Sequence, residues 1–435
     1  MRNFVLLWFG QVVSAIGSAM TGFTMSVWIY RETHSPTALS LAALSAALPA
    51  LLAPPLAGTL VDLWDRRKTM ILCDALAAVS TLMLILMLSS NRLELWHVCL
   101  ANALTSAFSS VSRLAESGSV ALLVPESQFG RANGLNEAGL SAVQILSPLF
   151  AGLLLGVAPV TTVLTIDLGT YLVALATLAL VRIPRPEPVL AAPAARTPGR
   201  RAWLANLTHG WRYIAHHRAL LVLCILFAVF NFIVASIGIL LQPLVLSFST
   251  ATVLGSLYSL GGFGALAGSI VLIAWGGPKD RVQGLLGALL VSGLCIVLAG
   301  WRPSVPWIGT AMFVFYFATP LLFSSNQSLW QANVPPAEQG RVFGARTFLM
   351  SWSSPLGLLA AGRLAERVFE PLLAPGGPAA DTIGRVIGVG SGRGIGLFFI
   401  VMGAIFVTLA LGARWLPSIR SLGSRRPEAA AAQLA

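Results

Sequence analysis

Arg113, Glu116 and Asp167 are ionisable side chains that lie within long apolar stretches of this chain, where an isolated charge would be costly. Arg113 and Glu116 are three residues apart, so on a helix they share a face and could form an internal ion pair. Asp167 has no basic residue within a helical turn. A charge at the centre of a bilayer costs roughly 2.5 to 3.5 kcal/mol. We expect structural pairing for Arg113 with Glu116 and hydroxyl partners such as Thr165 and Thr170 for Asp167, with substrate or proton handling as the alternative in both cases.

A second set of polar residues carries no charge and could line a cavity. Aromatic side chains with scattered amides suit a bulky, amphipathic ligand better than a sugar or a phosphate, which would need dense hydrogen bonding or buried bases. For any single aromatic residue, packing or lipid contact is the alternative. The candidates are Gln11, Ser14, Asn102, Asn231, Gln242, Tyr316, Asn326 and Gln327, with Trp28, Phe230 and Trp330 as aromatic members.

Constellations typical of enzymes, metal sites or cofactor sites are missing from the sequence. The four cysteines lie in apolar stretches without metal-ligand spacing. His216 and His217 are adjacent, so on a helix they point to different faces. The glycine-rich run at 388–396 does not follow a strand, and no phosphate-binding Walker loop is present. We therefore expect no enzymatic activity, no cofactor and no metal.

The elements that must position these residues follow from composition. Hydrophobic residues make up 56% of the 435 and charged residues 10%, which indicates a membrane protein. Apolar runs of about 20 residues without period-two alternation predict membrane-spanning helices, so the fold class is all-α. The twelve expected spans are 4–30, 38–61, 70–89, 95–117, 133–156, 160–181, 219–246, 252–275, 283–301, 306–330, 345–368 and 394–416.

The net charge of +12 follows the topology of these spans. Most basic residues fall on one side of the membrane, including the cluster at 66–68 and those in the segment 182–218. The positive-inside rule therefore places both termini in the cytoplasm of a multi-pass plasma membrane protein, the bacterial inner membrane. This distribution excludes nucleic acid as the expected partner.

A repeated pattern divides the spans into two related halves. Val-Pro, four residues, Gly-Arg, two residues and Gly occur at 124–134 and again at 334–344. Duplicated halves around a polar cavity are typical of secondary transporters. The predicted organisation is a six-helix bundle at 1–181, a cytoplasmic linker at 182–218, a second six-helix bundle at 219–416 and a cytoplasmic tail at 417–435. Within the linker, Trp203, Leu207, Trp211 and Ile214 predict an amphipathic helix.

The loop between the second and third spans carries Gly58, Asp62, Arg66, Arg67 and Lys68. This pattern resembles the signature loop of the major facilitator superfamily. The resemblance implies twelve helices in two pseudo-symmetric six-helix bundles. The opening segment 4–17, with Gln11 and Ser14, and the segment 131–135 resemble the branch of bacterial macrolide-efflux and enterobactin-exporter proteins.

The resemblance also implies that this loop latches the two halves, with Asp62 meeting the start of the eleventh span near Gly344. Two residues depart from the family pattern, Leu63 and Asp65, and ordinary inside-positive topology is the alternative to a latch. Arg66 and Arg67 need acidic partners at the same depth. The nearest candidates are Asp74, Glu116 and Glu137.

These observations favour a secondary active transporter that exports a hydrophobic or amphipathic small molecule in exchange for protons. Its expected partners are that small molecule, protons and the lipid bilayer, and one chain supplies both halves of a pathway, so we expect a monomer. The alternatives are an importer of a small nutrient and a non-transporting membrane sensor on the same scaffold.

Overall fold

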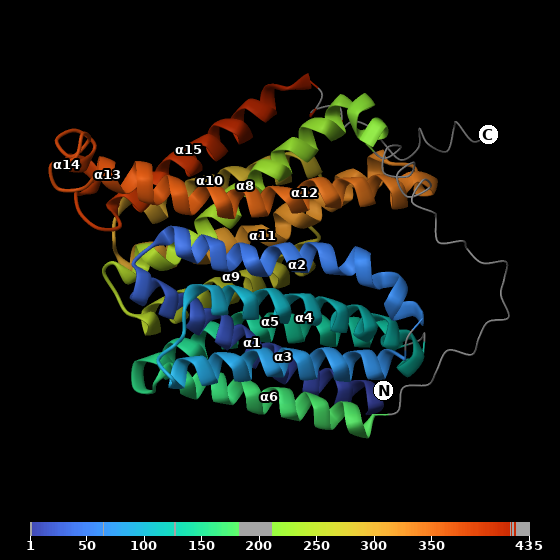
Figure 1. Ribbon diagram of the computed structural model, residues 1–435. Helices are drawn as coiled ribbons and strands as arrows, with labels where there is room; N and C mark the ends of the chain where they lie inside the picture. The colour runs from blue at the N-terminus through green and yellow to red at the C-terminus, as the bar shows by residue number, and fades with distance from the viewer. Residues whose placement is uncertain are drawn as a thin grey trace, which may run out of the picture. The chain divides into compact units, whose positions relative to one another are not determined.

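The structure is a computed structural model that describes residues 2–63, 65–125, 128–181, 211–417, 419 and 422. Side chains are described for these residues other than 54–63, 117, 118, 120–122, 129, 130, 133 and 336–341. Every regular element in this part of the chain is helical, as the continuous apolar runs predict (Figure 1). Most of the predicted linker and tail lies outside the described residues. Trp211 and Ile214, from the predicted amphipathic helix, lie on helical backbone at 211–216.

Within the described residues, six long helices form the first half of the chain. They are α1 (Arg2–Thr33), α2 (Pro36–Leu63), α3 (Arg66–Ser89), α4 (Leu95–Leu123), α5 (Phe129–Val157) and α6 (Val160–Leu180).

Six more long helices follow, together with a few short elements after the eleventh predicted span. The long helices are α8 (Arg218–Leu246), α9 (Ala251–Trp275), α10 (Arg281–Trp301), α11 (Val305–Asn333), α12 (Pro336–Leu364) and α15 (Arg393–Trp415). The short elements are a π-helical turn (Ala365–Phe369), α13 (Glu370–Leu372) and α14 (Gly384–Ile387).

Ten helices within the described residues are long and apolar enough to cross a membrane, which makes the chain a multi-pass membrane protein. The remaining two long helices, α4 and α12, each have 29 residues, but side chains in parts of both are not described. The count of twelve spans stays a prediction, and twelve long helices are available for it.

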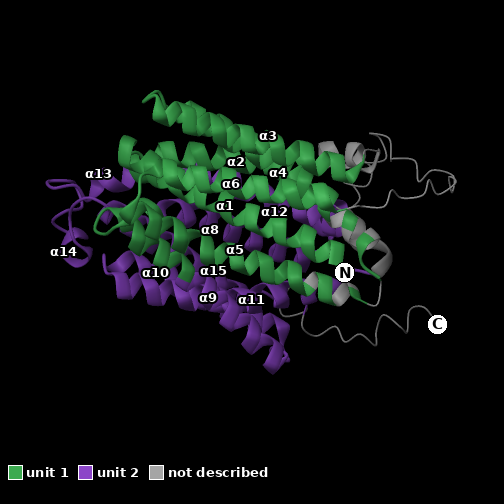
Figure 2. Ribbon diagram, turned by 90° about the horizontal axis from the view of Figure 1, so that it is seen from below, with its two compact units in different colours: residues 1–189, 241–259, 361–366 green, residues 190–240, 260–360, 367–435 purple. Residues whose placement is uncertain are grey.

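The chain divides into two compact units (Figure 2). Unit 1 consists of Met1–Val189, Leu241–Ser259 and Ala361–Glu366, so it contains α1 to α6 together with two short segments from later in the chain. Unit 2 consists of Leu190–Leu240, Leu260–Ala360 and Arg367–Ala435.

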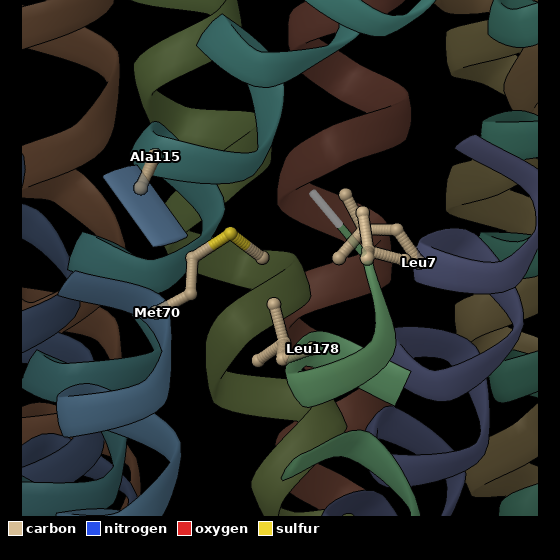
Figure 3. Close-up of a cluster of buried hydrophobic side chains, with 5 residues drawn as sticks. Leu7, Met70, Ala115 and Leu178 are labelled. Atoms are coloured by element: carbon tan, nitrogen blue, oxygen red, sulfur yellow. The ribbon is translucent and has the colours of Figure 1, made fainter. Parts of the chain in front are cut away.

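In unit 1, α1 packs against α5 and α6, and α4 packs against α2 and α3. A cluster of fully buried side chains joins α1, α3, α4 and α6 at one end, with Leu7, Met70, Ala115 and Leu178 each at most 1% exposed. Figure 3 shows Met70 and Leu178 pointing toward one another. Because lipid tails are as apolar as leucine, close packing of this kind holds membrane helices together.

Small residues allow helices to approach closely in both units. Within unit 1, a Cβ added to Gly152 of α5 would lie 2.8 Å from the Ala251 carbonyl oxygen and 3.1 Å from Gly255 Cα at the start of α9. Thr252 donates a hydrogen bond to the Gly152 carbonyl oxygen at 2.9 Å, which links the two helices where they cross. In unit 2, α10 packs against α11 and α15, and Gly293 of α10 lies against Gly403 of α15.

Candidate functional site

The predicted signature loop ends in a helix cap. Asp65 is the N-cap of α3, and its carboxylate accepts hydrogen bonds from the backbone amides of Arg67 at 3.1 Å and Lys68 at 3.3 Å. Replacing such a cap by alanine typically costs about 0.5 to 2 kcal/mol. Asp65, which departs from the family pattern, therefore starts the third helix of the first half.

The third helix of the second half starts in the same way. Asp280 is the N-cap of α10, and its carboxylate accepts from the amides of Val282 at 2.9 Å and Gln283 at 3.1 Å. The third helices of the two halves therefore share an aspartate N-cap.

Arg67 binds the end of another helix. Its Nε donates to the carbonyl oxygen of Leu178 at 2.8 Å, and its Nη2 donates to that of Ala179 at 2.6 Å. The last carbonyls of a helix have no partner within the helix and carry partial negative charge. Arg67 therefore ties the start of α3 to the end of α6, and its described partners are carbonyl oxygens rather than the acids we expected.

The other residues of the predicted latch lie in different settings. Side chains at 58 and 62 lie outside the described residues, so the contact of Asp62 with Gly344 stays a prediction. Among the described residues, a Cβ added to Gly344 would stand in open space. Lys68 and Glu137 are exposed.

Asp74 is buried within unit 1, at 6% exposure. Its carboxylate accepts from Gln11 Nε2 of α1 at 2.9 Å and from Ser112 Oγ of α4 at 3.0 Å. Glu116, one turn further along α4, is close enough to Asp74 and to Arg113 for their charges to interact. The structure thus joins Asp74 to Gln11, a residue assigned from sequence to the cavity, and Glu116 lies within the range over which its charge acts on Asp74.

Arg113 has a local partner. Its Nη2 donates to Ser110 Oγ at 3.2 Å and its side chain is exposed. In the part of the chain that the structure describes, no carboxylate lies within ion-pair distance of it. The predicted close pair with Glu116 is absent there because a shared helix face leaves two long side chains free to extend in different directions.

Asp167 of α6 is surrounded by hydroxyl groups and is 1% exposed. Thr21 of α1 and Thr81 of α3 donate to its Oδ2 at 2.9 and 3.0 Å. Ser18 donates to its Oδ1 at 3.3 Å, and Thr170 is 3.5 Å away. Hydroxyl partners were expected, but the two shortest bonds come from other helices. Thr165, an expected partner, donates instead to the Thr161 carbonyl oxygen.

The remaining cavity candidates divide between the units. In unit 1, Ser14 is buried, Asn102 donates to the Ala42 carbonyl oxygen at 3.2 Å, and the buried Gln242 has an Oε1 without a hydrogen-bond partner among the described residues. In unit 2, Asn231 and Tyr316 are half-buried.

Gln327 contacts Arg346, a basic residue of α12 that was not among the cavity candidates. Gln327 Oε1 accepts from Arg346 Nη1 of α12 at 2.9 Å. The Arg346 guanidinium lies 5.0 Å from the centroid of the Trp330 ring and 5.8 Å from that of Phe343. Asn326 is 1% exposed, and neither of its amide atoms has a partner among the described residues.

Among the described side chains, no group of three or more His, Cys, Asp or Glu residues could hold a metal ion. All four cysteines are free.

Long apolar helices with buried acids and amides are typical of membrane transport proteins. The sequence matches the profile of the Major Facilitator Superfamily over residues 7–358, and the chain belongs to that superfamily. Its relatives are transporters and not enzymes.

Two efflux proteins are among the similar curated sequences. Macrolide efflux protein A of Streptococcus pyogenes is 23% identical over 435 residues, with 97% of each chain covered. The multidrug efflux pump Tap of Mycolicibacterium fortuitum is 22% identical over 376 residues, with 83% of this chain and 89% of Tap covered.

Solved structures share the fold. A bacterial homologue of the iron transporter ferroportin, in an inward-facing state, superposes with a TM-score of 0.69 at 13% identity, with 98% of this chain and 99% of that chain covered. A bacterial homologue of the lysosomal transporter Spinster superposes with a TM-score of 0.67 at 14% identity, with 96% and 98% covered.

Proposed function

We propose that this transporter exports a hydrophobic or amphipathic small molecule and that inward movement of protons drives the export. The observation that carries the proposal is the pair of acids in unit 1, Asp74 and Glu116. Asp74 is buried, its hydrogen-bond donors among the described residues are one amide and one hydroxyl, and Glu116 lies within its electrostatic range. Such a pair can bind and release a proton inside the protein.

The pair is placed to link proton binding to helix movement. Asp74 lies on α3, its donors Gln11 and Ser112 lie on α1 and α4, and Glu116 lies on α4. A carboxylate accepts both hydrogen bonds, whereas a protonated carboxyl must also donate one. A change of protonation therefore changes the bonds that hold three helices together.

Asp167 is the second candidate for the proton site, and its surroundings favour a structural role. Hydroxyl groups from α1, α3 and α6 all face it, and each hydroxyl can rotate to donate or to accept. We assign to Asp167 the joining of α1, α3 and α6 and to Asp74 with Glu116 the binding of the proton.

The export direction and the substrate class rest on the relatives. Two of them are named for efflux, one of macrolides and one of multiple drugs. Uncharged aromatic and amide residues supply the lining that a bulky amphipathic compound requires. Alternating access is reversible, so the driving gradient sets the direction.

Topology and assembly complete the proposal. We place the protein in the bacterial inner membrane with both termini in the cytoplasm, on the distribution of basic residues. We propose a monomer because one chain supplies both halves of a pathway. In this topology Gly58, Asp62, Arg66, Arg67 and Lys68 lie on the cytoplasmic side, where Asp62 latches the halves near Gly344.

Efflux from cells tests the proposal directly. Cells that lack their own major efflux pumps, with and without this protein, are loaded with erythromycin, ethidium or fusidate, and retention is followed with and without a protonophore. Export predicts lower retention of at least one compound and loss of that difference on uncoupling. Higher retention in the expressing cells would identify an importer, and efflux that survives uncoupling would exclude proton coupling.

A further inference from the structure

Arg346 is a fixed, half-buried cation in unit 2. One nitrogen of its guanidinium is held by Gln327 and its plane lies near two aromatic rings, those of Trp330 and Phe343. Among the described residues no carboxylate pairs with it. Arginine has five N–H donors, and the hydrogen bond to Gln327 uses one of them.

The same face of α11 carries buried polar groups that have no hydrogen-bond partner in the part of the chain that the structure describes. Asn326 and Trp330 are four residues apart, so they lie one above the other on the helix. Neither amide atom of Asn326 nor Nε1 of Trp330 has a hydrogen-bond partner among the described residues, although the two side chains are 1% and 0% exposed. Buried polar groups are nearly always paired in native proteins, so such a set points to a ligand.

An aromatic surface continues from this cluster along α11. Phe323 is four residues before Gln327, and its ring centroid lies 6.2 Å from that of Phe227 and 6.0 Å from that of Phe230 on α8. A ligand with an apolar aromatic body could lie on the ring of Phe323, which is 47% exposed and is backed by the buried rings of Phe227 and Phe230, while its polar end reaches Asn326 and Arg346.

We propose that Asn326, Trp330 and Arg346 form a binding site for the carboxylate of an amphipathic, aromatic organic anion. The inference deepens the proposed function and rests on it, because it defines which amphipathic molecules the transporter accepts. Arg346, Trp330 Nε1 and Asn326 Nδ2 supply N–H donors, and a carboxylate presents only acceptors. A cationic ligand would meet the guanidinium without a compensating acid. In the proposed topology the site lies at the cytoplasmic ends of α11 and α12, where an exporter would collect its substrate.

Three compounds with one naphthalene body separate the effect of charge from that of shape. Binding of 1-naphthylacetate, neutral 1-naphthylacetamide and cationic 1-(1-naphthyl)ethylamine is measured by calorimetry. The full-length protein is held in nanodiscs of phosphatidylcholine, which carries no net charge. The site predicts that the anion binds best and that Arg346→Gln weakens its binding at least about tenfold, with the amide changed by less than about twofold. Equal binding of the three compounds, or an unchanged affinity of Arg346→Gln for the anion, would overturn the proposal.

Asn326→Leu supplies an independent variant with two readouts. Removing a buried amide without partners should raise the thermal midpoint of the ligand-free protein while weakening naphthylacetate binding. A merely structural Asn326 predicts the opposite, a lower midpoint and unchanged binding, and that result would overturn the site. Arg385→Gln, an exposed arginine on α14, is the matched control and should leave binding unchanged.

Two further outcomes are distinct. If phosphatidylglycerol stabilises the protein through Arg346 and naphthylacetate does not bind, the site belongs to a lipid headgroup and the proposal is wrong. Because binding is measured without a proton gradient, efflux that fails while anion binding persists contradicts the export proposal alone. If Arg346→Gln leaves efflux unchanged and the natural protein does not bind the anion, the proposed site is wrong and the export proposal stands.

Discussion

Arg67 and Leu178 are joined by a hydrogen bond of 2.8 Å from the guanidinium Nε to the carbonyl oxygen, and the bond connects the first turn of α3 with the last turn of α6. The contact lies beside the apolar cluster of Leu7, Met70 and Ala115. Hydrogen bonds from a charged side chain and apolar packing therefore stabilise the same end of unit 1. The basic loop residue therefore has a structural partner inside its own unit.

Replacing Arg67 by alanine should destabilise the protein by about 1 to 3 kcal/mol, because two carbonyl oxygens at the end of α6 lose charge-assisted hydrogen bonds. Thermal unfolding of the purified protein measures the change. Lys68→Ala is the control, since Lys68 is exposed, and should have little effect. Equal losses of stability in the two variants would mean that only the positive charge contributes and that the hydrogen bonds from Arg67 to α6 do not.

The two N-caps should respond alike to substitution. Asp65→Ala and Asp280→Ala each remove a carboxylate that accepts two backbone amides, and each should cost about 0.5 to 2 kcal/mol. Asp65→Ser and Asp280→Ser, which keep a capping oxygen, should recover most of that loss. Unfolding midpoints of the four variants measure these effects, and a harmless Asp65→Ala would contradict the role given to Asp65.

The crossing of α5 with the start of α9 should not accept a side chain. A Cβ at Gly152 would lie 2.8 Å from a backbone oxygen, whereas one at Gly169 of α6 would meet nothing within 4 Å. Gly152→Ala should therefore destabilise by about 1 to 3 kcal/mol through overpacking. Gly169→Ala should be neutral or stabilising by up to about 1 kcal/mol. The same unfolding assay compares them, and the reverse order would contradict the packing described.

Glu370 predicts a pH dependence of stability outside the membrane spans. Its carboxylate accepts from the amides of Gly392 at 3.3 Å and Ile395 at 3.1 Å at the start of α15. Burial raises the pKa of Glu370 above its usual value, although these amides and Arg393 act in the opposite direction. For an acid whose pKa is raised by folding, the contribution to stability is largest at low pH and is lost as the pH rises through the folded-state pKa.

The comparison with Glu370→Gln, which does not titrate, isolates this contribution. The stability of the natural protein relative to that of Glu370→Gln should fall as the pH rises from about 4, the ordinary pKa range of a glutamate, through the raised pKa of the folded state. Unfolding midpoints across this range measure it. A relative stability that rises with pH would show that the amides and Arg393 lower the pKa of Glu370 by more than burial raises it.

The sequence predicts correctly those features that one segment determines by itself, such as helix formation and burial. The apolar runs predict the long helices because a span of about 20 residues must satisfy its backbone internally. The burial of Asp167 and its need for hydroxyl partners also follow from the sequence. The choice of Thr21 and Thr81 as partners does not, because it depends on how α1 and α3 pack on α6.

The partners of the charged loop residues were harder to predict. Arg67 binds backbone carbonyls, which have no signature in the sequence. Arg346 stands at the border of a span and reads as a topological charge, whereas its contacts with Gln327 and Trp330 arise only when α11 and α12 pack together. The adjacent amides Asn326 and Gln327 were the sequence signal for this site. Finding Arg346 would have required pairing them with the nearest basic residue in another span.

Proton movement in reconstituted liposomes tests the central claim most directly. Liposomes that contain the protein, the pH dye pyranine and the best exported compound are diluted into buffer without that compound. We predict that the lumen acidifies as the compound leaves. Glu116→Gln and Asp74→Asn should each abolish the acidification while compound exchange across the membrane continues. The control Glu137→Gln, which changes an exposed acid, should behave as the natural protein does. Efflux without acidification, or unchanged acidification in both Glu116→Gln and Asp74→Asn, would contradict proton coupling through this acid pair.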